Sequence, residues 1–242
     1  MRIVIASSPK TGNKWLKCLL GSVYDLAMWF GDDTPETNPA KFAAWVAAGN
    51  FVDNTIFHQH CRYTSKLCDV VEAAPAHLVT IVRDPYDSFV SMYYWLQTRA
   101  PFDEMRGKAR PQRPKDGVIG KPIDDPAVLD FLATTYGTYL RRANDWATSG
   151  RAVVARYEAL HNDQFGELTR ITNAIAPADP AAIEAAIEAC TADRMRATSR
   201  KMATHIRSAK VGDSKERLSE PHYDIFRRQY GDLVRSLGYQ VR

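Results

Sequence analysis

The sequence predicts a single α/β domain in which helices flank a mostly parallel sheet. Short runs rich in β-branched residues alternate along the chain with longer segments of helical periodicity, the order typical of strand-helix-strand units. The 242 residues are 45% hydrophobic, which provides for one large core, and we find neither an internal repeat nor a linker between two compositions. We therefore expect one domain over residues 1–242.

Four short apolar runs, each followed by polar residues, are the expected strands. They lie at residues 3–6, 55–57, 78–82 and 152–155. Helices are expected where apolar residues recur every three or four positions. The first such stripe starts at Lys14 and continues to Ala27, and the last contains Phe226, Tyr230, Leu233 and Leu237.

Three further helices are predicted by Asp-Pro pairs, in which the aspartate caps the helix and the proline occupies its first position. These pairs are Asp84-Pro85, Asp125-Pro126 and Asp179-Pro180. The second pair starts a helical stripe that continues to Trp146. Residues 97–125 are rich in proline, glycine and charges of both signs, which is typical of a mobile surface loop or lid.

The composition excludes several classes of protein. The formal net charge of +4 is too small for a general nucleic-acid or membrane surface. No run approaches the roughly 18 apolar residues of a membrane span, and no apolar signal region follows Met1, so we expect a cytoplasmic protein. The cysteines contain no Cys-x-x-Cys pair, and we expect all of them to be reduced. They are Cys18, Cys61, Cys68 and Cys190.

The first expected strand leads into a polar loop, Ser7-Ser8-Pro9-Lys10-Thr11-Gly12-Asn13-Lys14, and then into a helix. Such a turn binds anions, because the N–H groups of the helix N-terminus point out of it. Lys10 and Lys14 add cations, and Gly12 permits a close backbone approach. The loop is not of the Gly-x-x-x-x-Gly-Lys-Ser/Thr type, because Asn13-Lys14 follows Gly12. An ordinary connection with surface lysines is the alternative.

A second feature suited to anions follows the third expected strand. Arg83 stands at the strand's end, and Ser88 and Ser91 lie three residues apart on one face of the next helix. A guanidinium and a hydroxyl in these places can hold one phosphate. The alternative is an exposed arginine beside a capped helix.

Four segments together resemble the cytosolic-type sulfotransferases. The loop from Ser8 to Leu16 is similar to their 5′-phosphosulfate motif, Pro-Lys-[Ser/Thr/Ala]-Gly-x-x-Trp, and the segment from Arg83 to Ser91 to their 3′-phosphate motif. Residues 156–160 resemble their Arg-Tyr-Glu-Asp-Leu, and residues 207–215 resemble their late Arg-Lys-Gly…Gly-Asp-Trp-Lys segment. The four segments follow the family's order. The resemblance implies a P-loop-kinase-like sulfotransferase fold.

The family's donor is 3′-phosphoadenosine 5′-phosphosulfate (PAPS), which leaves 3′-phosphoadenosine 5′-phosphate (PAP) after transfer. The resemblance implies that Trp15 and Tyr157 bind the adenine, and that the 3′-phosphate is held by Arg83, Ser91 and Arg207. It assigns the 5′ end of the donor to the loop residues Lys10, Thr11, Gly12, Asn13 and Lys14.

The sequence departs from the family pattern at three places. Asn13-Lys14 stands where the family has two hydroxyl residues, so Lys14 substitutes a charge. Arg207-Ser208-Ala209 replaces Arg-Lys-Gly, which removes a cation and a glycine, and Ser214 replaces a tryptophan. We therefore expect the 3′-phosphate to depend more on Arg83 and Ser91 than on Arg207.

The family transfers the sulfuryl group in line to a hydroxyl, with a histidine as general base and the loop lysine stabilising the departing phosphate. The resemblance assigns these roles to His60 and Lys10, because Phe57-His58-Gln59-His60-Cys61 stands where the family commonly has Lys-Thr-His. Histidine has a suitable pKa for this work near neutrality. Strand alternation places His58 and His60 on one face, so spacing alone does not separate them.

Two histidines on one face also suggest a metal such as zinc, but no third ligand of suitable spacing follows, and this transfer requires no metal. Ordinary polar roles for both histidines are a further alternative.

The expected acceptor is a hydroxyl of a small molecule or glycan, on a phenol, a sugar or a natural product. The chain length favours compact bacterial members, and residues 156–195 look like glycopeptide-modifying sulfotransferases. No nucleic-acid or membrane partner is expected, and a homodimer stays open. Two other functions also stay open: a nucleotide-dependent small-molecule kinase with a degenerate phosphate loop, and a non-catalytic nucleotide-binding module.

Overall fold

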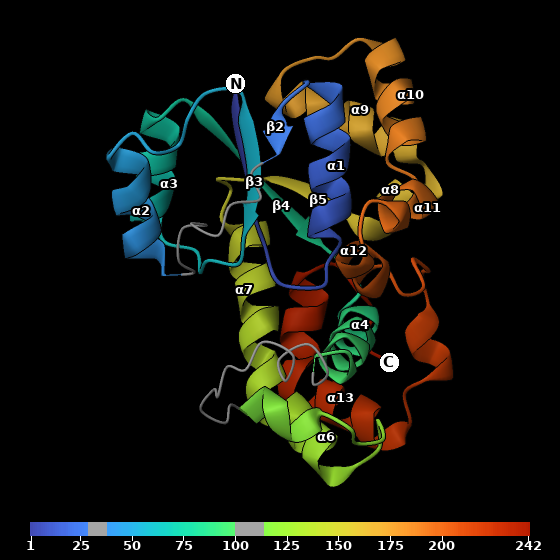
Figure 1. The fold of residues 1–242 in the computed structure, drawn as a ribbon. Helices are drawn as coiled ribbons and strands as arrows, with labels where there is room; N and C mark the ends of the chain where they lie inside the picture. The colour runs from blue at the N-terminus through green and yellow to red at the C-terminus, as the bar shows by residue number, and fades with distance from the viewer. Residues whose placement is uncertain (29–37, 100–113) are drawn as a thin grey trace. The chain divides into compact units, whose positions relative to one another are not determined.

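The computed structural model describes residues 1–28, 38–99 and 114–242 (Figure 1). The chain divides into two compact units. The first comprises Met1–Arg83 and Arg142–Arg194, and the second comprises Asp84–Arg141 and Met195–Arg242. Each unit therefore combines segments that are distant in the sequence.

A five-stranded sheet forms the centre of the first unit. Its strands are β1 (Arg2–Ala6), β2 (Ala27–Met28), β3 (Thr55–Gln59), β4 (Ala76–Val82) and β5 (Val153–Arg156). Their spatial order is β2-β3-β1-β4-β5, and every neighbouring pair is parallel. The predicted α/β class with a mostly parallel sheet is confirmed, and the carboxyl ends of all its strands share one edge.

Helices cover both faces of this sheet, which is why its strands read as nearly continuous apolar runs. Alternation sends Ile3 and Ile5 of β1 to one core, whereas Val4 and Ala6 enter the other. The helices on the first face are α1 (Asn13–Val23), α8 (Tyr157–Asn162), α9 (Gln164–Ile175) and α10 (Pro180–Ala189). On the second face lie α2 (Pro39–Ala47) and α3 (Ser65–Ala73) (Figure 1). Trp146 of α7 (Gly137–Thr148) packs into the same core.

The second unit is helical and has an aromatic core. Phe89, Tyr136 and Phe226 contact one another there, with ring centroids 5.2 to 6.3 Å apart. Its main helices are α4 (Pro85–Gln97), α6 (Pro126–Phe131), α12 (Arg200–His205) and α13 (Glu220–Ser236), with the start of α7 and the end of α11 (Ala192–Ala197). Three tight turns complete it: the 3₁₀ turns η1 (Pro114–Val118) and η3 (Asp213–Glu216), and the π-helical turn η2 (Leu132–Tyr136).

The three helix starts predicted from Asp-Pro pairs are confirmed at Pro85, Pro126 and Pro180, and each aspartate side chain accepts a first-turn N–H. The stripe that leads to Trp146 is not one helix, however, because η2 interrupts it. The hydroxyl of Tyr230 donates to the carbonyls of Leu132 and Ala133, at 2.7 and 2.8 Å. An inserted side-chain donor of this kind satisfies carbonyls that a π turn frees.

The expected extent of the first helix is wrong. Helix α1 ends at Val23, and Ala27, which we expected in the helix, lies in β2. Asp25 adopts a left-handed φ of +50°, which turns the chain, and the N–H of Ala27 then donates to the Asn54 carbonyl at 2.9 Å. Sheet pairing thus replaces helix where the apolar pattern alone would allow either. The end we expected at residues 31–33 lies outside the described residues.

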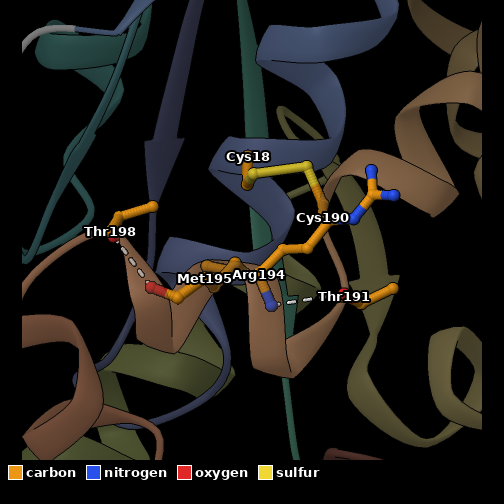
Figure 2. Close-up of a disulfide and its surroundings, with 6 residues drawn as sticks. All are labelled: Cys18, Cys190, Thr191, Arg194, Met195 and Thr198. Atoms are coloured by element: carbon orange, nitrogen blue, oxygen red, sulfur yellow. Dashed lines mark hydrogen bonds between the residues drawn. A yellow bond between two sulfur atoms is a disulfide. The ribbon is translucent and has the colours of Figure 1, made fainter.

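The expectation that all cysteines are reduced is wrong for one pair. Cys18 of α1 and Cys190 at the end of α10 form a disulfide, with their Cα atoms 5.9 Å apart (Figure 2). The two residues are 172 positions apart, and only the packing of α1 against α10 brings them together. The expectation is confirmed for Cys61 and Cys68, which are free and buried.

The segment predicted as a mobile loop, residues 97–125, lies partly outside the described residues. Its later part contacts α4: Gln97 donates to the Val118 carbonyl at 2.9 Å and accepts the Gly120 N–H at 2.7 Å. The Tyr93 hydroxyl donates to the Lys121 carbonyl at 2.8 Å. These bonds hold residues 118–121 against α4, and the mobility of the segment stays a prediction.

Candidate active site

Four residues of interest occupy equivalent places, each directly after a strand of the first unit. Ser7 follows β1, His60 follows β3, Arg83 follows β4 and Tyr157 follows β5. Because these strands are parallel and adjacent in the order β3-β1-β4-β5, the four residues lie along one edge of the sheet. This is the edge at which open α/β sheets bind ligands.

The loop between β1 and α1 has an unusual backbone. Lys10 and Gly12 both have left-handed φ angles, +70° and +106°. A Cβ at Gly12 would lie 2.7 Å from a ring carbon of Tyr157, so only glycine fits both the conformation and the close approach. Lys10 adopts the same region as a non-glycine residue, and such local strain is concentrated at functional sites.

The side chains of Thr11 and Asn13 are turned into the loop itself. The Thr11 hydroxyl donates to the Ser8 carbonyl at 2.9 Å, and Asn13 Nδ2 donates to the same oxygen at 2.8 Å. The Ser7 hydroxyl donates to Asn13 Oδ1. Ser7, Ser8, Thr11 and Asn13 are all buried. These side chains shape the loop.

Trp15, Arg83 and Tyr157, which the resemblance assigns to one nucleotide, form one cluster. The Arg83 guanidinium carbon lies 4.2 Å from the centroid of the Tyr157 ring. Trp15, in the first turn of α1, meets the same ring edge-on at a centroid distance of 5.5 Å. The cluster thus combines aromatic faces with a fixed cation, a combination suited to a base and a phosphate.

His60 is half-buried and held at several points. Its Nδ1 lies 3.0 Å from the Ser7 carbonyl, and its backbone N–H donates to Gln59 Oε1 at 2.9 Å. The His58 ring lies 5.6 Å from the His60 ring between centroids, as strand alternation predicted. Cys61, which follows His60 in the sequence, is held by Trp146, whose Nε1 donates to the Cys61 carbonyl at 3.0 Å.

Burial lowers the pKa of His60 to about 4. The hydrogen bond to Ser7 raises this pKa, whereas the nearby cations Arg142, Lys10 and Lys14 lower it. The ring is therefore neutral at pH 7. A carbonyl oxygen only accepts, so the proton of the neutral ring sits on Nδ1 and the lone pair on Nε2. His60 thus presents a proton acceptor in a positively charged environment.

Ser7 and Arg142 were not singled out from the sequence. Ser7 acts through its carbonyl, which no side-chain pattern reveals. Arg142 lies one helical turn before Trp146 on α7, and the bond from Trp146 to Cys61 brings this face of the helix to the end of β3. Lys17, also missed, is buried in α1, and burial lowers its pKa to about 8.

The second unit holds the other two predicted phosphate ligands, Ser91 on α4 and Arg207. Asp87 of α4 accepts the backbone N–H groups of Gly212 and Ser214, at 2.6 and 2.9 Å, which brings the late segment to the first turn of α4. Arg207 forms an ion pair with Asp213, and its guanidinium lies 4.1 Å from the Tyr94 ring centroid. The roles of Ser91 and Arg207 toward a phosphate stay predictions.

The sulfotransferase domain family matches residues 1–238 of the sequence. The chain belongs to this family. The match runs through both units and includes all four segments on which the sequence resemblance rests, so the predicted sulfotransferase fold is confirmed. No curated protein sequence matches this sulfotransferase.

Solved structures share the sulfotransferase fold. A mouse sulfotransferase, SULT7A1, complexed with PAP, has a TM-score of 0.69 at 15% identity, with 97% of this chain and 84% of that one covered. A retinol dehydratase in complex with androsterone and the inactive cofactor PAP has a TM-score of 0.60 at 12% identity, with 97% of this chain and 81% of that one covered. A complex of retinol dehydratase with retinol and PAP has a TM-score of 0.58 at 12% identity, with 98% of this chain and 82% of that one covered. At these identities the likeness is one of fold.

The described residues of this sulfotransferase hold no group of three or more His, Cys, Asp and Glu side chains arranged to bind a metal ion. Within the same ranges, no helix has the length and apolar character needed to cross a membrane.

Proposed function

We propose that this sulfotransferase transfers a sulfuryl group from PAPS to a hydroxyl of a small molecule, a sugar or a natural product, with His60 as the general base. The observation that carries the proposal is the 3.0 Å contact between His60 Nδ1 and the Ser7 carbonyl, at the start of the loop that precedes α1. This contact leaves Nε2 as a proton acceptor beside a loop suited to an anion.

The cluster at the ends of β4 and β5 supports PAPS as the donor. Trp15 and Tyr157 offer aromatic faces to an adenine, and Arg83 offers a guanidinium to a phosphate. The close approach of Gly12 to Tyr157 draws the loop backbone against the same cluster. The similar solved structures were determined with PAP, the nucleotide that remains after sulfuryl transfer.

The proposed mechanism assigns one task to each residue. PAPS supplies a sulfuryl group on a phosphate that leaves readily. His60 Nε2 accepts the proton of the acceptor hydroxyl as that oxygen forms its bond to sulfur. Lys10 neutralises the charge that grows on the phosphate oxygen as its bond to sulfur breaks. The products are a sulfate ester, PAP and the proton that His60 later releases.

The low pKa of His60 fits this cycle. Burial above all, with a smaller contribution from Lys10, Lys14 and Arg142, keeps the ring neutral before PAPS binds. Bound PAPS carries several negative charges, which offset the charge of these cations. We therefore expect PAPS binding to raise the pKa of His60 and to make Nε2 a stronger base. The base is thus neutral when the acceptor arrives and becomes more basic in the complex.

The acceptor class rests on the chemistry of the base and on the sequence. A neutral histidine suits the proton of a hydroxyl. Retinol and androsterone, each of which carries a hydroxyl, are bound in two of the similar structures. The resemblance of residues 156–195 to glycopeptide-modifying enzymes favours a natural product. A cytoplasmic location, a bacterial origin and a homodimer stay expectations from the sequence.

Calorimetric titration with PAP and with ADP, followed by a transfer assay with PAPS and a panel of alcohols, phenols and glycosides, tests the proposal. We expect tight binding of PAP, much weaker binding of ADP, and a sulfated product detected by mass spectrometry. Equal affinity for the two nucleotides contradicts a dedicated 3′-phosphate site. Phosphorylation of an acceptor with ATP supports the kinase instead, and tight PAP binding without any modified acceptor supports a binding module.

A further inference from the structure

The amide side chain of Asn13 makes hydrogen bonds that few other residue types could make at this position. It is the first residue of α1, it is only 5% exposed, and its side chain makes two bonds in opposite senses. Oδ1 accepts the Ser7 hydroxyl, and Nδ2 donates to the Ser8 carbonyl at 2.8 Å. A carboxylate could only accept here, whereas an amide accepts and donates at once.

Ser7 connects this amide to His60. Its N–H donates to the Gln59 carbonyl at 3.2 Å, which continues the pairing of β1 with β3 by one residue. Its carbonyl lies 3.0 Å from His60 Nδ1, and its hydroxyl donates to Asn13. All three polar groups of Ser7 are therefore engaged, and the residue is 0% exposed.

The next peptide is held as firmly. The Ser8 carbonyl receives two donors, Asn13 Nδ2 and the Thr11 hydroxyl, at 2.8 and 2.9 Å. Hydrogen bonds therefore connect Ser7 to β3 of the sheet and Ser8 to Asn13 at the start of α1. If Asn13 releases the turn Ser7-Ser8, the Ser7 carbonyl gains freedom to rotate away from the His60 ring.

We propose that Asn13 is a positioning residue for the base: through Ser7 and Ser8 it fixes the carbonyl that holds the Nδ1–H tautomer of His60 and so directs Nε2 to the acceptor. The proposal rests on the proposed role of His60. It gives Asn13, which the sequence resemblance places among the donor ligands, a side-chain function that is independent of donor contact.

The test compares Asn13→Ala, Asn13→Thr and Ser7→Ala with the wild type and with a control, Asp179→Ala. The control removes the cap that accepts the Ala181 N–H in α10 and so costs stability without changing the loop. Threonine at position 13 keeps one hydroxyl that can accept and donate. For each variant we would measure kcat, the dissociation constant of PAP, the melting temperature, and the tautomer of His60 by ¹⁵N NMR.

For Asn13→Ala we expect kcat to fall roughly tenfold or more, because a small misplacement of a reacting group costs about that much. The PAP dissociation constant should change less than about threefold, and the His60 ¹⁵N shifts should move toward a mixture of tautomers. Ser7→Ala should show the same pattern more weakly, and Asn13→Thr should restore part of the rate. Asp179→Ala should lower the melting temperature and leave kcat and the tautomer unchanged.

The inference is overturned if Asn13→Ala keeps the wild-type tautomer, or if it weakens PAP binding as strongly as it lowers kcat, since Asn13 would then act on the donor directly. It is also overturned if the control loses as much rate. The NMR measurement needs no turnover. A His60→Ala variant that retains full transfer would refute His60 as the base, and this outcome is separate from the tautomer result.

Discussion

The guanidinium of Arg83 stacks on the ring of Tyr157, with 4.2 Å between the guanidinium carbon and the ring centroid. The contact follows from the register of the sheet. Val82 of β4 pairs with Arg156 of β5, and Arg83 and Tyr157 directly follow these two strands. Two residues 74 positions apart thus come into contact because their strands are parallel neighbours.

Arg83→Ala is expected to weaken PAP binding by roughly 10- to 100-fold, the worth of a charge-assisted bond to phosphate. Adenosine 5′-phosphate, which lacks the 3′-phosphate, should lose much less affinity. Ser91→Ala should also weaken the binding of PAP more than that of adenosine 5′-phosphate, with a smaller loss of affinity than Arg83→Ala. Calorimetry with both ligands measures this, and equal losses for the two ligands would show that Arg83 does not read the 3′-phosphate.

Lys10→Ala should lower the rate of the chemical step more than it weakens donor binding, because charge on the phosphate oxygen grows only as the bond to sulfur breaks. Single-turnover rates at saturating PAPS measure the step, with Lys14→Ala as the comparison for a second loop cation. If saturating donor restores the wild-type rate in Lys10→Ala, this lysine is a binding cation only.

His60→Ala should reduce transfer by about 10² to 10⁴ and leave PAP affinity nearly intact, whereas His58→Ala should keep substantial activity. Because a base must be unprotonated and the pKa of His60 in the free enzyme is lowered to about 4, the kcat/KM of the wild type for PAPS, which reports the enzyme before PAPS binds, should stay level as pH falls from 8 to 6. It should fall only as the pH approaches 4.

The pH profile of kcat/KM for both variants provides the check. A residual His60→Ala activity with the wild-type profile, together with an inactive His58→Ala, would assign the base to His58 instead. An acid limb near pH 6.5 in the wild type would contradict the lowered pKa of His60.

Ala209→Gly should raise the free energy of unfolding by roughly 0.5 to 1 kcal/mol. Ala209 has a left-handed φ of +52°, and it stands where the family's late motif has glycine. Glycine removes the steric cost of that conformation. Ala185→Gly, on an exposed position of α10, is the matched control and should lower stability by about 1 kcal/mol. Chemical denaturation measures both, and a loss of stability at both sites would contradict the strain at Ala209.

Reduction of the Cys18–Cys190 disulfide should lower the stability of the first unit by about 2 to 4 kcal/mol, the usual effect of opening a covalent link over a long segment. Thermal melts with and without dithiothreitol measure the loss. A Cys18→Ser/Cys190→Ser double variant should melt like the reduced protein and be insensitive to the reductant. Titration of the unfolded, unreduced protein should find the thiols of Cys61 and Cys68 only, and four reactive thiols would show that the bond is absent in solution.

The elements that the sequence predicted well are those with strong local signals. Asp84, Asp125 and Asp179 cap helices because an aspartate followed by proline favours a helix start in any context. Helix α2, which was not predicted, starts with Asn38-Pro39 rather than Asp-Pro and has only a short apolar stripe. Ala27 shows the limit of periodicity, since the Asn54 carbonyl, distant in the sequence, decides that it pairs in a sheet.

The sequence by itself determined the α/β class and the family, because each depends on residue types and spacings within short segments. Only the tertiary structure decided that the Ser7 carbonyl selects the tautomer of His60, that Arg83 stacks on Tyr157, and that Cys18 meets Cys190. The physical reason is that these contacts join separate strands and helices. Their geometry is set by strand order, register and helix packing, which no single segment of the chain contains.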